Sequence, residues 1–387
     1  MSSLLTLSGE TSPEKATEKT KRLLILDVLR GIAVLGILFL NIYSMGMIDF
    51  AYVDFDPRQL SDLLIDSMNA FFFDGRFRSL FCLLFGIGIY LQIKQQQIFE
   101  QPELKRINSR LKWLLFFGFI HCSLIWSGDI LMMYAICGLL VKKQLTLPPN
   151  ELLTKGIKFT GVGLLILAAQ GALTYASYPP VNRGSEIFLE TFELWTADFI
   201  YPFFMQLYYT LITLIFFPVY GFYFCGLMLL GVAAYQLNIF THGIAKRYLP
   251  RLWCATLCIS LLDVLVRYYL PFKSEALTFP LSSFSGLLMA FLIIDWLVKN
   301  QHRLKSCTEY FANVGRLSFS FYILQSISMV ALFRYWQPQL QLSFTRLDYL
   351  LLTLGFCLVQ LMIAHWYFKF FTIGPLEKLW RTAVNSP

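Results

Sequence analysis

Residues 26–48 read LDVLRGIAVLGILFLNIYSMGMI. A helix needs about 20 apolar residues to cross the hydrocarbon core of a bilayer, and this run is long enough even though it carries Asp27 and Arg30. A cleaved signal peptide would have a shorter apolar core and a cleavage site with small residues. We therefore predict that residues 26–48 form a retained first membrane-spanning helix.

Nine further apolar runs follow this first one. They are 76–93, 111–127, 129–142, 157–176, 207–235, 252–270, 277–298, 314–335 and 348–368. The short run 129–142 is separated from its predecessor only by Ser127-Gly128, which predicts a tight hairpin. Pro218 and Gly221 within 207–235 could kink one helix or divide two. The pattern predicts an all-α transmembrane bundle of about ten spans.

The composition supports this assignment. The chain is 57% hydrophobic and only 14% charged, whereas soluble domains carry about 25% charged residues. The net charge of +8 does not indicate nucleic-acid binding, because the basic residues lie between the apolar runs and form no single patch. With the N-terminus inside, the outside segments hold only Arg58, Arg183, Lys273, Arg334 and Arg346. This positive-inside bias predicts that both termini are cytoplasmic.

The predicted spans divide the chain into three parts. These are a cytoplasmic tail at 1–25, the bundle at 26–371 and a second cytoplasmic tail at 372–387. The largest outside segment, about 177–206, is acidic and rich in aromatic residues, which predicts an interfacial helix. Residues 57–73 look similar, because Asp62 and Asp66 lie opposite an apolar stripe. That stripe comprises Leu60, Leu63, Leu64, Met68 and Phe71.

Motifs of soluble enzymes are absent from the sequence. It contains no Walker A loop, no dinucleotide-binding glycine pattern after a strand and no HExxH. The eight Cys include no CxxC pair and no Cys/His cluster with the spacing of a zinc site. We predict no metal site, no tightly bound cofactor and no nucleic-acid partner.

Ionisable residues at membrane depth are costly, so each is a candidate for function. Asp27 and Arg30 lie three residues apart and face the same side of the first helix. They could form a local ion pair near the interface, or Arg30 could turn into the bundle and hold an anionic group. Asn41 lies about three turns further along the helix, where it could bond a neighbouring helix or contact a substrate.

Two more candidates lie at the predicted outer face. Arg76 and Arg78 open the second span on the side that otherwise avoids positive charge. They could anchor the helix by snorkelling or bind an anionic or polar substrate.

His121 and Asp129 are the candidate catalytic residues. Imidazole can take and return a proton near neutral pH, and His121 lies roughly two turns before the hairpin that carries Asp129. The carboxylate could fix the tautomer of the imidazole if Asp129 folded back across the turn. The alternative is a packed, hydrogen-bonded histidine with no catalytic part.

The ninth run carries a polar stripe. Arg316 lies at its inner face and Gln325 near its midplane, and Ser318, Tyr322 and Gln325 recur at helical spacing. Such a stripe indicates a cavity or a polar neighbouring helix. Asp263 and Arg267, four residues apart, are most simply an intrahelical pair.

The polar motifs together resemble the bacterial YeiB family, long described as a domain of unknown function. The first match is Asp27-Val-Leu-Arg-Gly31 with Leu40-Asn41-Ile42. The others follow in order at 76–86, 118–134, 315–325 (GRLSFSFYILQ) and 374–381 (GPLEKLWR). The resemblance covers nearly the whole chain and implies a multi-pass protein of the bacterial inner membrane with roughly ten helices.

The resemblance extends distantly to transmembrane acyltransferases such as lysosomal heparan-α-glucosaminide acetyltransferase, whose first span also has a D-x-x-R-G opening and a later Asn. Those enzymes pass an acetyl group from cytosolic acetyl-CoA to an acceptor on the far side. Their essential His follows the Asn, whereas the stretch 45–54 here contains none. The assignment of His121 is therefore an inference from its depth in the bundle.

The leading hypothesis is an integral-membrane acyltransferase. Cytosolic acyl-CoA would bind near Asp27, Arg30 and Arg316, and His121 would act as general base or transient acyl carrier. A small-molecule, lipid or glycan acceptor would contact the remaining candidates, which are Asn41, Arg76, Arg78 and Gln325.

The alternatives are a transporter or exporter that uses the same polar cavity, and a structural membrane protein. Transporters often contain an internal repeat with interrupted helices, and the N-terminal motifs have no counterpart in 200–387. The partners implied are the lipid bilayer and the acceptor, and the chain could also form a homo-oligomer.

Overall fold

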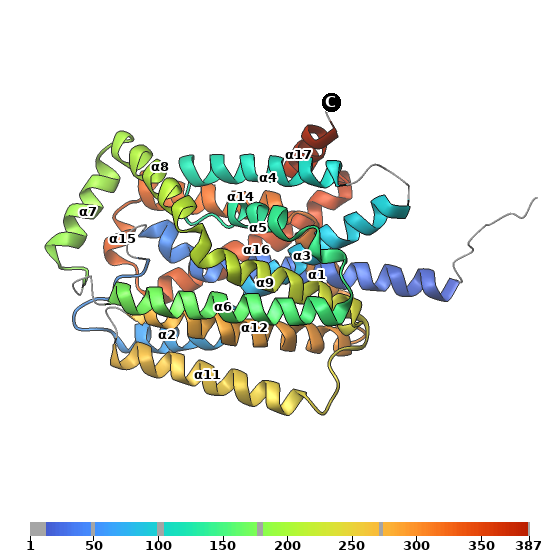
Figure 1. Ribbon diagram of the computed structural model, residues 1–387. Coiled ribbons are helices and arrows are strands. Elements are labelled where there is room, and N and C mark those ends of the chain that lie inside the picture. Colours follow the sequence, from blue (N-terminus) through green and yellow to red (C-terminus); the bar gives the residue numbers. More distant parts are fainter. Residues whose placement is uncertain (1–12, 48–50, 99–103, 176–180, 271–273, 386–387) are drawn as a thin grey trace, which may run out of the picture.

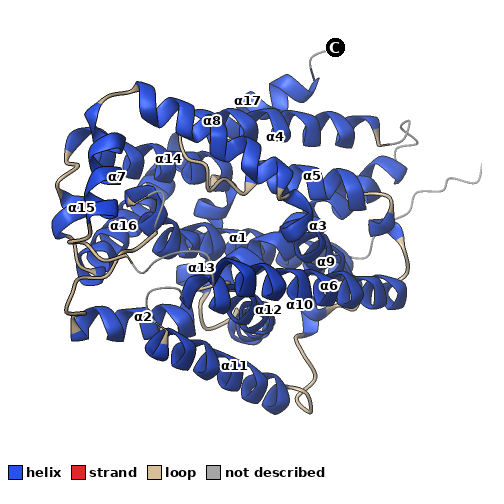
Figure 2. Cartoon of the chain, turned by 60° about the vertical axis from the view of Figure 1, so that its left-hand side comes forward, coloured by secondary structure: helices blue, strands red, loops and turns tan. Residues whose placement is uncertain are grey.

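The computed structural model describes residues 13–47, 51–98, 104–175, 181–270 and 274–385 (Figure 1). Within these ranges the chain is helical, with helices joined by loops and no strand (Figure 2). The helices are α1 (Pro13–Gly46), α2 (Leu60–Phe72), α3 (Arg76–Ile98), α4 (Lys105–Leu124), α5 (Leu131–Val141), α6 (Pro149–Tyr175), α7 (Glu186–Ala197), α8 (Ile200–Ile215), α9 (Phe217–Gln236), α10 (Ile239–His242), α11 (Leu249–Tyr269), α12 (Ser274–Asn300), α13 (Lys305–Arg316), α14 (Ser318–Val330), α15 (Leu340–Ser343), α16 (Arg346–Phe370) and α17 (Pro375–Asn385). Two short elements, η1 (Gln144–Thr146) and the π-helical η3 (Ala331–Trp336), complete the described part.

Seven helices in the described ranges are long and apolar enough to cross a membrane, or up to eight if a bent pair counts as one span. The bent pair is α13 and the helix after it, which meet at 77°. Helices α5 and α8 are apolar but shorter. The all-α fold is thus confirmed, and the count of ten spans stays a prediction.

Burial separates central helices from peripheral ones. In the most apolar windows, 67% of residues in α1 and 72% in α9 are buried, against 17% in α11 and 28% in α16. The outward faces of α11 and α16 consist largely of exposed leucines. An apolar surface of this extent is typical of contact with lipid, so the peripheral helices shield α1 and α9 from the bilayer.

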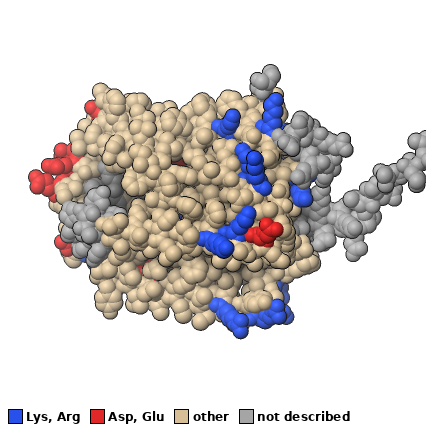
Figure 3. Space-filling model, in the orientation of Figure 1, with Lys and Arg blue, Asp and Glu red and all other residues tan. Residues whose placement is uncertain are grey.

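Charged side chains lie at the two ends of the bundle. On the face seen in Figure 3, Lys and Arg gather mainly at the right, Asp and Glu mainly at the left, and the band between carries almost no charge. We call these the basic end, where α4 begins and α17 lies, and the acidic end, where α7 lies (Figure 1). This distribution agrees with a polytopic membrane protein whose basic loops share one side.

Two glycines bring α1 and α13 into backbone contact. A Cβ built on Gly31 would lie 1.9 Å from Phe311 O, and one on Gly315 would lie 1.9 Å from Asp27 O. Small residues allow this approach between membrane helices. The crossing sets Asp27 and Arg30 beside the end of α13.

The structure corrects the ninth predicted span. The run 314–335 was predicted as one helix, but α13 ends at Arg316 and α14 begins at Ser318 in a different direction. The contact of Gly315 with α1 holds the end of α13 in place, so α14 must turn at Leu317 to enter the bundle. The run 207–235 is likewise divided, since α8 ends at Ile215 and α9 begins at Phe217, with Pro218 in its first turn.

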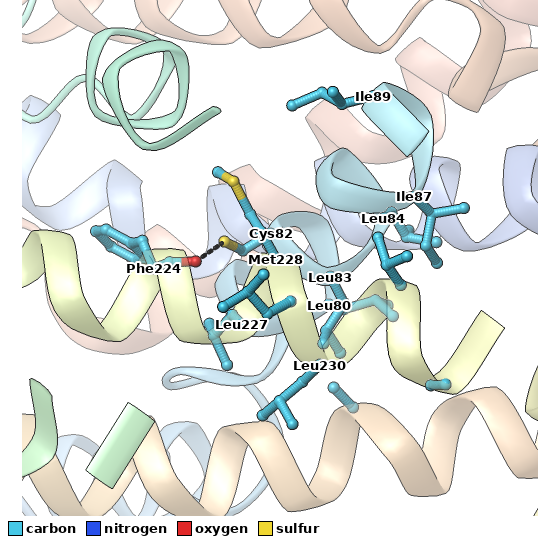
Figure 4. Close-up of a cluster of buried hydrophobic side chains, with 14 of the residues drawn as sticks. Leu80, Cys82, Leu83, Leu84, Ile87, Ile89, Phe224, Leu227, Met228 and Leu230 are labelled. Atoms are coloured by element: carbon cyan, nitrogen blue, oxygen red, sulfur yellow. Dashed lines mark hydrogen bonds between the residues drawn. The ribbon is translucent and has the colours of Figure 1, made fainter. Parts of the chain in front are cut away.

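The main apolar core lies between α3 and α9. Leu80, Leu83 and Leu84 of α3 face Leu227 and Met228 of α9 (Figure 4). Close approach again depends on glycine, because a Cβ on Gly86 would lie 2.5 Å from Met228 O and one on Gly231 would lie 2.3 Å from Leu83 O. This packing fixes α3, which forms one wall of the site described below.

A buried ion-pair network joins several helices at the acidic end. Asp66 of α2 contacts Arg58 (2.7 Å), Arg267 of α11 (3.3 Å) and Arg346 of α16 (3.3 Å). Arg267 also contacts Asp74 and, at 2.9 Å, Asp263. The predicted intrahelical pair of Asp263 and Arg267 is confirmed, and the structure shows that it belongs to this larger network.

The same network explains the orientation of α2. Asp62 and Asp66 are buried, whereas Leu60 and Leu64 are exposed. The expected apolar stripe exists, but its leucines Leu60 and Leu64 face away from the protein. The carboxylates turn inward: Asp66 meets arginines of other elements, and Asp62 accepts hydrogen bonds from the Tyr52 hydroxyl and from Arg346 N. The acidic outside segment was predicted at about 177–206, and its residues 177–180 lie outside the described residues. Helix α7 and the start of α8 form most of the rest and are rich in aromatic residues, as expected.

Candidate functional site

A cavity of about 690 Å³ lies among α1, α3, α4, α5, α14 and the segment 372–381. At the basic end its lining includes the exposed residues Gln95, Arg316, Thr372 and Arg381. Its apolar walls come from α1, α3 and α4, and comprise Val34, Ile37, Phe81, Leu84, Phe85, Ile107, Leu111 and Leu114. The buried side chains of Leu131, Tyr134 and Tyr322 line its inner part. The cavity therefore leads from a charged mouth into the core.

Three predicted residues lie at the mouth. Arg30 Nη1 contacts Asp27 Oδ1 at 2.7 Å, and both line the cavity. Arg316 donates to Thr372 O at 3.2 Å, and its guanidinium lies 3.9 Å from the centre of the Phe368 ring. The predicted ion pair is thus confirmed, and Arg30 is half-buried and lines the cavity, while its binding of an anionic group stays a prediction.

Two more arginines of the mouth come from segments that were predicted as loop and tail. Arg110 belongs to the wall formed by α4, and Arg381 reaches the cavity from α17. Burial lowers the pKa of the Arg110 guanidinium to about 10, and the positive charges of Arg381, Arg106 and Arg30 act in the same direction. Such a concentration of like charge is unfavourable unless an anion joins it.

The C-terminal segment packs against the bundle. The Glu377 carboxylate accepts hydrogen bonds from Phe319 N (2.9 Å) and Ser320 N (3.1 Å), which are free donors at the start of α14. Trp380 Nε1 donates to Arg110 O at 3.1 Å, and the Arg110 guanidinium stacks 4.3 Å from the indole ring centre. Residues 372–381 therefore form one side of the mouth.

His121 and Asp129 meet as expected. His121 Nδ1 lies 2.9 Å from Asp129 Oδ1, and both side chains are buried. Met132 N donates to the other carboxylate oxygen at 2.8 Å. The hairpin closes because a glycine faces it: a Cβ on Gly118 would lie 2.5 Å from Met132 N. Asp129 does fold back across the turn.

Tyr322 completes this group. Its hydroxyl donates to Asp129 Oδ1 (3.3 Å) and accepts from Ile130 N (3.2 Å). Its ring centre lies 5.4 Å from that of His121. Tyr322 lines the cavity, whereas His121 and Asp129 do not appear in its lining. The candidate catalytic pair thus reaches the cavity through Tyr322.

The structure does not bring the four predicted acceptor-binding residues into the cavity lining. Gln325 is buried and donates to Val34 O (3.1 Å) and Gln360 Oε1 (2.9 Å), which links α14 to α1 and α16. Arg76 is fully buried and donates to Ser260 at 2.6 Å. Arg78 donates to Ser283 at 3.1 Å. Asn41 is half-buried and does not line the cavity, although it lies only about one turn beyond the lining residue Ile37, and its role stays a prediction.

Sequence reasoning missed Arg110, Arg381 and Trp380 as parts of the site. Arg110 and Arg381 were interpreted only as basic residues that set the topology. In the sequence, an arginine that binds an anion cannot be distinguished from an arginine that only marks a cytoplasmic loop. Among the described residues, no group of three or more His, Cys, Asp and Glu side chains could hold a metal ion.

The fold and the cavity define a polytopic helical membrane protein with a polar site. Residues 234–386 match a family described as "Protein of unknown function (DUF418)". No solved structure matches the chain significantly.

Relatives cover nearly the full length. The chain is 27% identical to the Bacillus subtilis (strain 168) protein called "Uncharacterized protein YxaH", over 95% of each chain. It is also 27% identical to the Escherichia coli (strain K12) protein called "Uncharacterized protein YeiB", over 93% of this chain and 96% of the relative. The resemblance to YeiB-like proteins of unknown function is thereby confirmed.

Proposed function

We propose that the protein is an integral-membrane acyltransferase that takes an acyl group, in the first instance acetyl, from cytosolic acyl-CoA. The acceptor would be a small molecule, lipid or glycan at the membrane or its outer side. In this proposal the basic end faces the cytoplasm of a bacterial cell and the protein lies in the inner membrane. The observation that carries the proposal is the single cavity that joins the arginines of the mouth to Tyr322 and the His121–Asp129 pair.

The mouth suits the phosphates of a coenzyme A thioester. Arg30, Arg110, Arg316 and Arg381 line it together, and guanidinium groups bind phosphate through paired charge-assisted hydrogen bonds. Asp27 is paired with Arg30, and Glu377 accepts hydrogen bonds from α14. The arginines therefore outnumber the nearby carboxylates, and a polyanion would compensate the excess charge.

The inner part of the cavity suits the other end of the same ligand. Its apolar walls can accept the uncharged pantetheine arm, which would place the thioester near Tyr322. The imidazole–carboxylate pair next to Tyr322 is of the type that accepts a proton from a hydroxyl or amine during acyl transfer. The proposal thus assigns one function to each end of the cavity.

The first prediction concerns binding of CoA to the purified protein in detergent, measured by isothermal titration calorimetry. Arg110→Ala should weaken binding by about 10- to 100-fold, because a hydrogen bond to a charged group contributes about 1.5–3 kcal/mol. Arg251→Ala is the matched control, since Arg251 is exposed at the start of α11 and does not line the cavity. Equal affinities of the two variants would contradict the assignment of the mouth.

The activity itself is tested with acetyl-CoA and permeabilised membrane vesicles from cells that overproduce the protein. Release of free thiol and transfer of labelled acetyl to a vesicle component are expected. A protein that binds CoA but releases no thiol would contradict the enzyme and leave a carrier as the better account of the cavity.

A further inference from the structure

The three members of the buried catalytic group differ in their access to the cavity. Tyr322 lines the cavity, while His121 and Asp129 are absent from the lining. His121 is 1% exposed and Asp129 is 4% exposed. A ligand in the cavity would therefore meet the phenol before it could meet the imidazole.

We propose that Tyr322 is the catalytic residue that touches the reacting groups, and that the His121–Asp129 pair acts through it. This inference rests on the proposed acyltransferase function. It changes the assignment made from the sequence, because His121 becomes a positioning residue that orients and supports Asp129.

The hydrogen bonds around Tyr322 fit such a relay. Asp129 Oδ1 receives the Tyr322 hydroxyl and also contacts His121 Nδ1, so one oxygen joins the two rings. Ile130 N donates to the Tyr322 oxygen and thereby fixes its position. That oxygen has a second lone pair, which can accept a proton from a group in the cavity.

The imidazole is held through one of its two nitrogens. His121 Nε2 is buried and has no hydrogen-bond partner among the described residues. A histidine kept only for packing would normally satisfy both ring nitrogens. The Nδ1 contact with Asp129 is therefore the contact through which this ring is held.

The reaction balances as a proton relay. The acceptor hydroxyl or amine gives its proton to Tyr322 Oη as the Tyr322 proton moves to Asp129 Oδ1. The acceptor atom then bonds to the carbonyl carbon of the thioester, and the carbon–sulfur bond breaks. The proton returns from Asp129 through Tyr322 to the thiolate, which leaves as free CoA thiol.

Tyr322→Phe tests the relay, because it removes one hydroxyl and keeps the ring. Tyr349→Phe is the matched control: Tyr349 is also a buried tyrosine, but it does not line the cavity and its hydroxyl has no hydrogen-bond partner among the described residues. Thiol release from acetyl-CoA in permeabilised vesicles gives kcat and KM, and calorimetry gives the affinity for CoA.

The expected result for Tyr322→Phe is a fall in kcat of about 100-fold, the scale of general acid–base catalysis, with KM and CoA affinity unchanged. Tyr349→Phe should keep kcat within about twofold, because it removes a hydroxyl that lies outside the cavity and makes no hydrogen bond. The double variant Tyr322→Phe/His121→Gln should be no slower than the slower single variant, because residues that act as a unit are not additive.

Three outcomes would count against the relay. Wild-type kcat in Tyr322→Phe, or additive losses in the double variant, would overturn the assignment of Tyr322 and leave the acyltransferase standing. CoA binding without thiol release by the wild-type protein would overturn the proposed function, and the relay with it.

Discussion

Gly88→Leu is expected to abolish measurable CoA binding while the protein stays folded. Gly88 lines the cavity next to Arg30, and a Cβ built on it would meet only Arg30 Nη2, at 3.8 Å. The first carbon of a side chain therefore fits without a clash, and the remaining carbons of leucine must extend into the space that a ligand would occupy. The affinity should fall by more than about 100-fold, which corresponds to about 2.8 kcal/mol of binding free energy.

The measurement is calorimetry on purified protein, with thermal unfolding in the same detergent as a check of the fold. Gly161→Leu is the matched control, because a Cβ on Gly161 of α6 would meet nothing within 4 Å and the residue does not line the cavity. Both variants should keep the wild-type unfolding temperature. Wild-type affinity in Gly88→Leu would show that CoA does not bind in this cavity.

The positions of most helices could be predicted because a helix needs about 20 apolar residues to cross the hydrocarbon core of a bilayer. The predicted run 76–93 lies within α3, and the run 252–270 ends one residue beyond α11. The break at Leu317 could not be predicted in this way, because the hydropathy of 314–335 is continuous. Its cause is a contact between Gly315 and α1, which links residues far apart in the sequence.

The candidate site was predictable where its parts are close in the chain. His121 and Asp129 are eight residues apart across a hairpin that the Ser127-Gly128 pair indicates, and the structure joins them. Arg110 and Arg381 reach the same mouth from opposite halves of the sequence, so no local pattern could connect them. Hydrophobic periodicity also could not predict that Asp66 is buried. It shows that a helix has an apolar and a polar face, but it does not show which of the two faces turns toward the protein.

Asp66 is also the residue whose loss should cost the most stability. Its carboxylate contacts Arg58, Arg267 and Arg346, and the side chains of Arg267 and Arg346 are only 9% and 7% exposed. Asp66→Asn keeps the volume but removes the charge, so these guanidinium groups remain buried with less compensation. Removing one partner of a buried ion pair costs about 3–5 kcal/mol, because charge in a low-dielectric interior is poorly solvated.

The fall in stability should appear as a lower midpoint when the protein in detergent micelles is titrated with denaturing detergent. Glu190→Gln is the matched control, since Glu190 is exposed on α7 at the same end of the bundle, and a single exposed charge contributes about 0–1 kcal/mol. The two midpoints should therefore differ clearly. If Asp66→Asn unfolded together with Glu190→Gln, the network would contribute little to the fold, and the inward turn of Asp62 and Asp66 would need another cause. With the predicted loss, Asp66 is the residue through which the acidic end holds α2, α11 and α16 together.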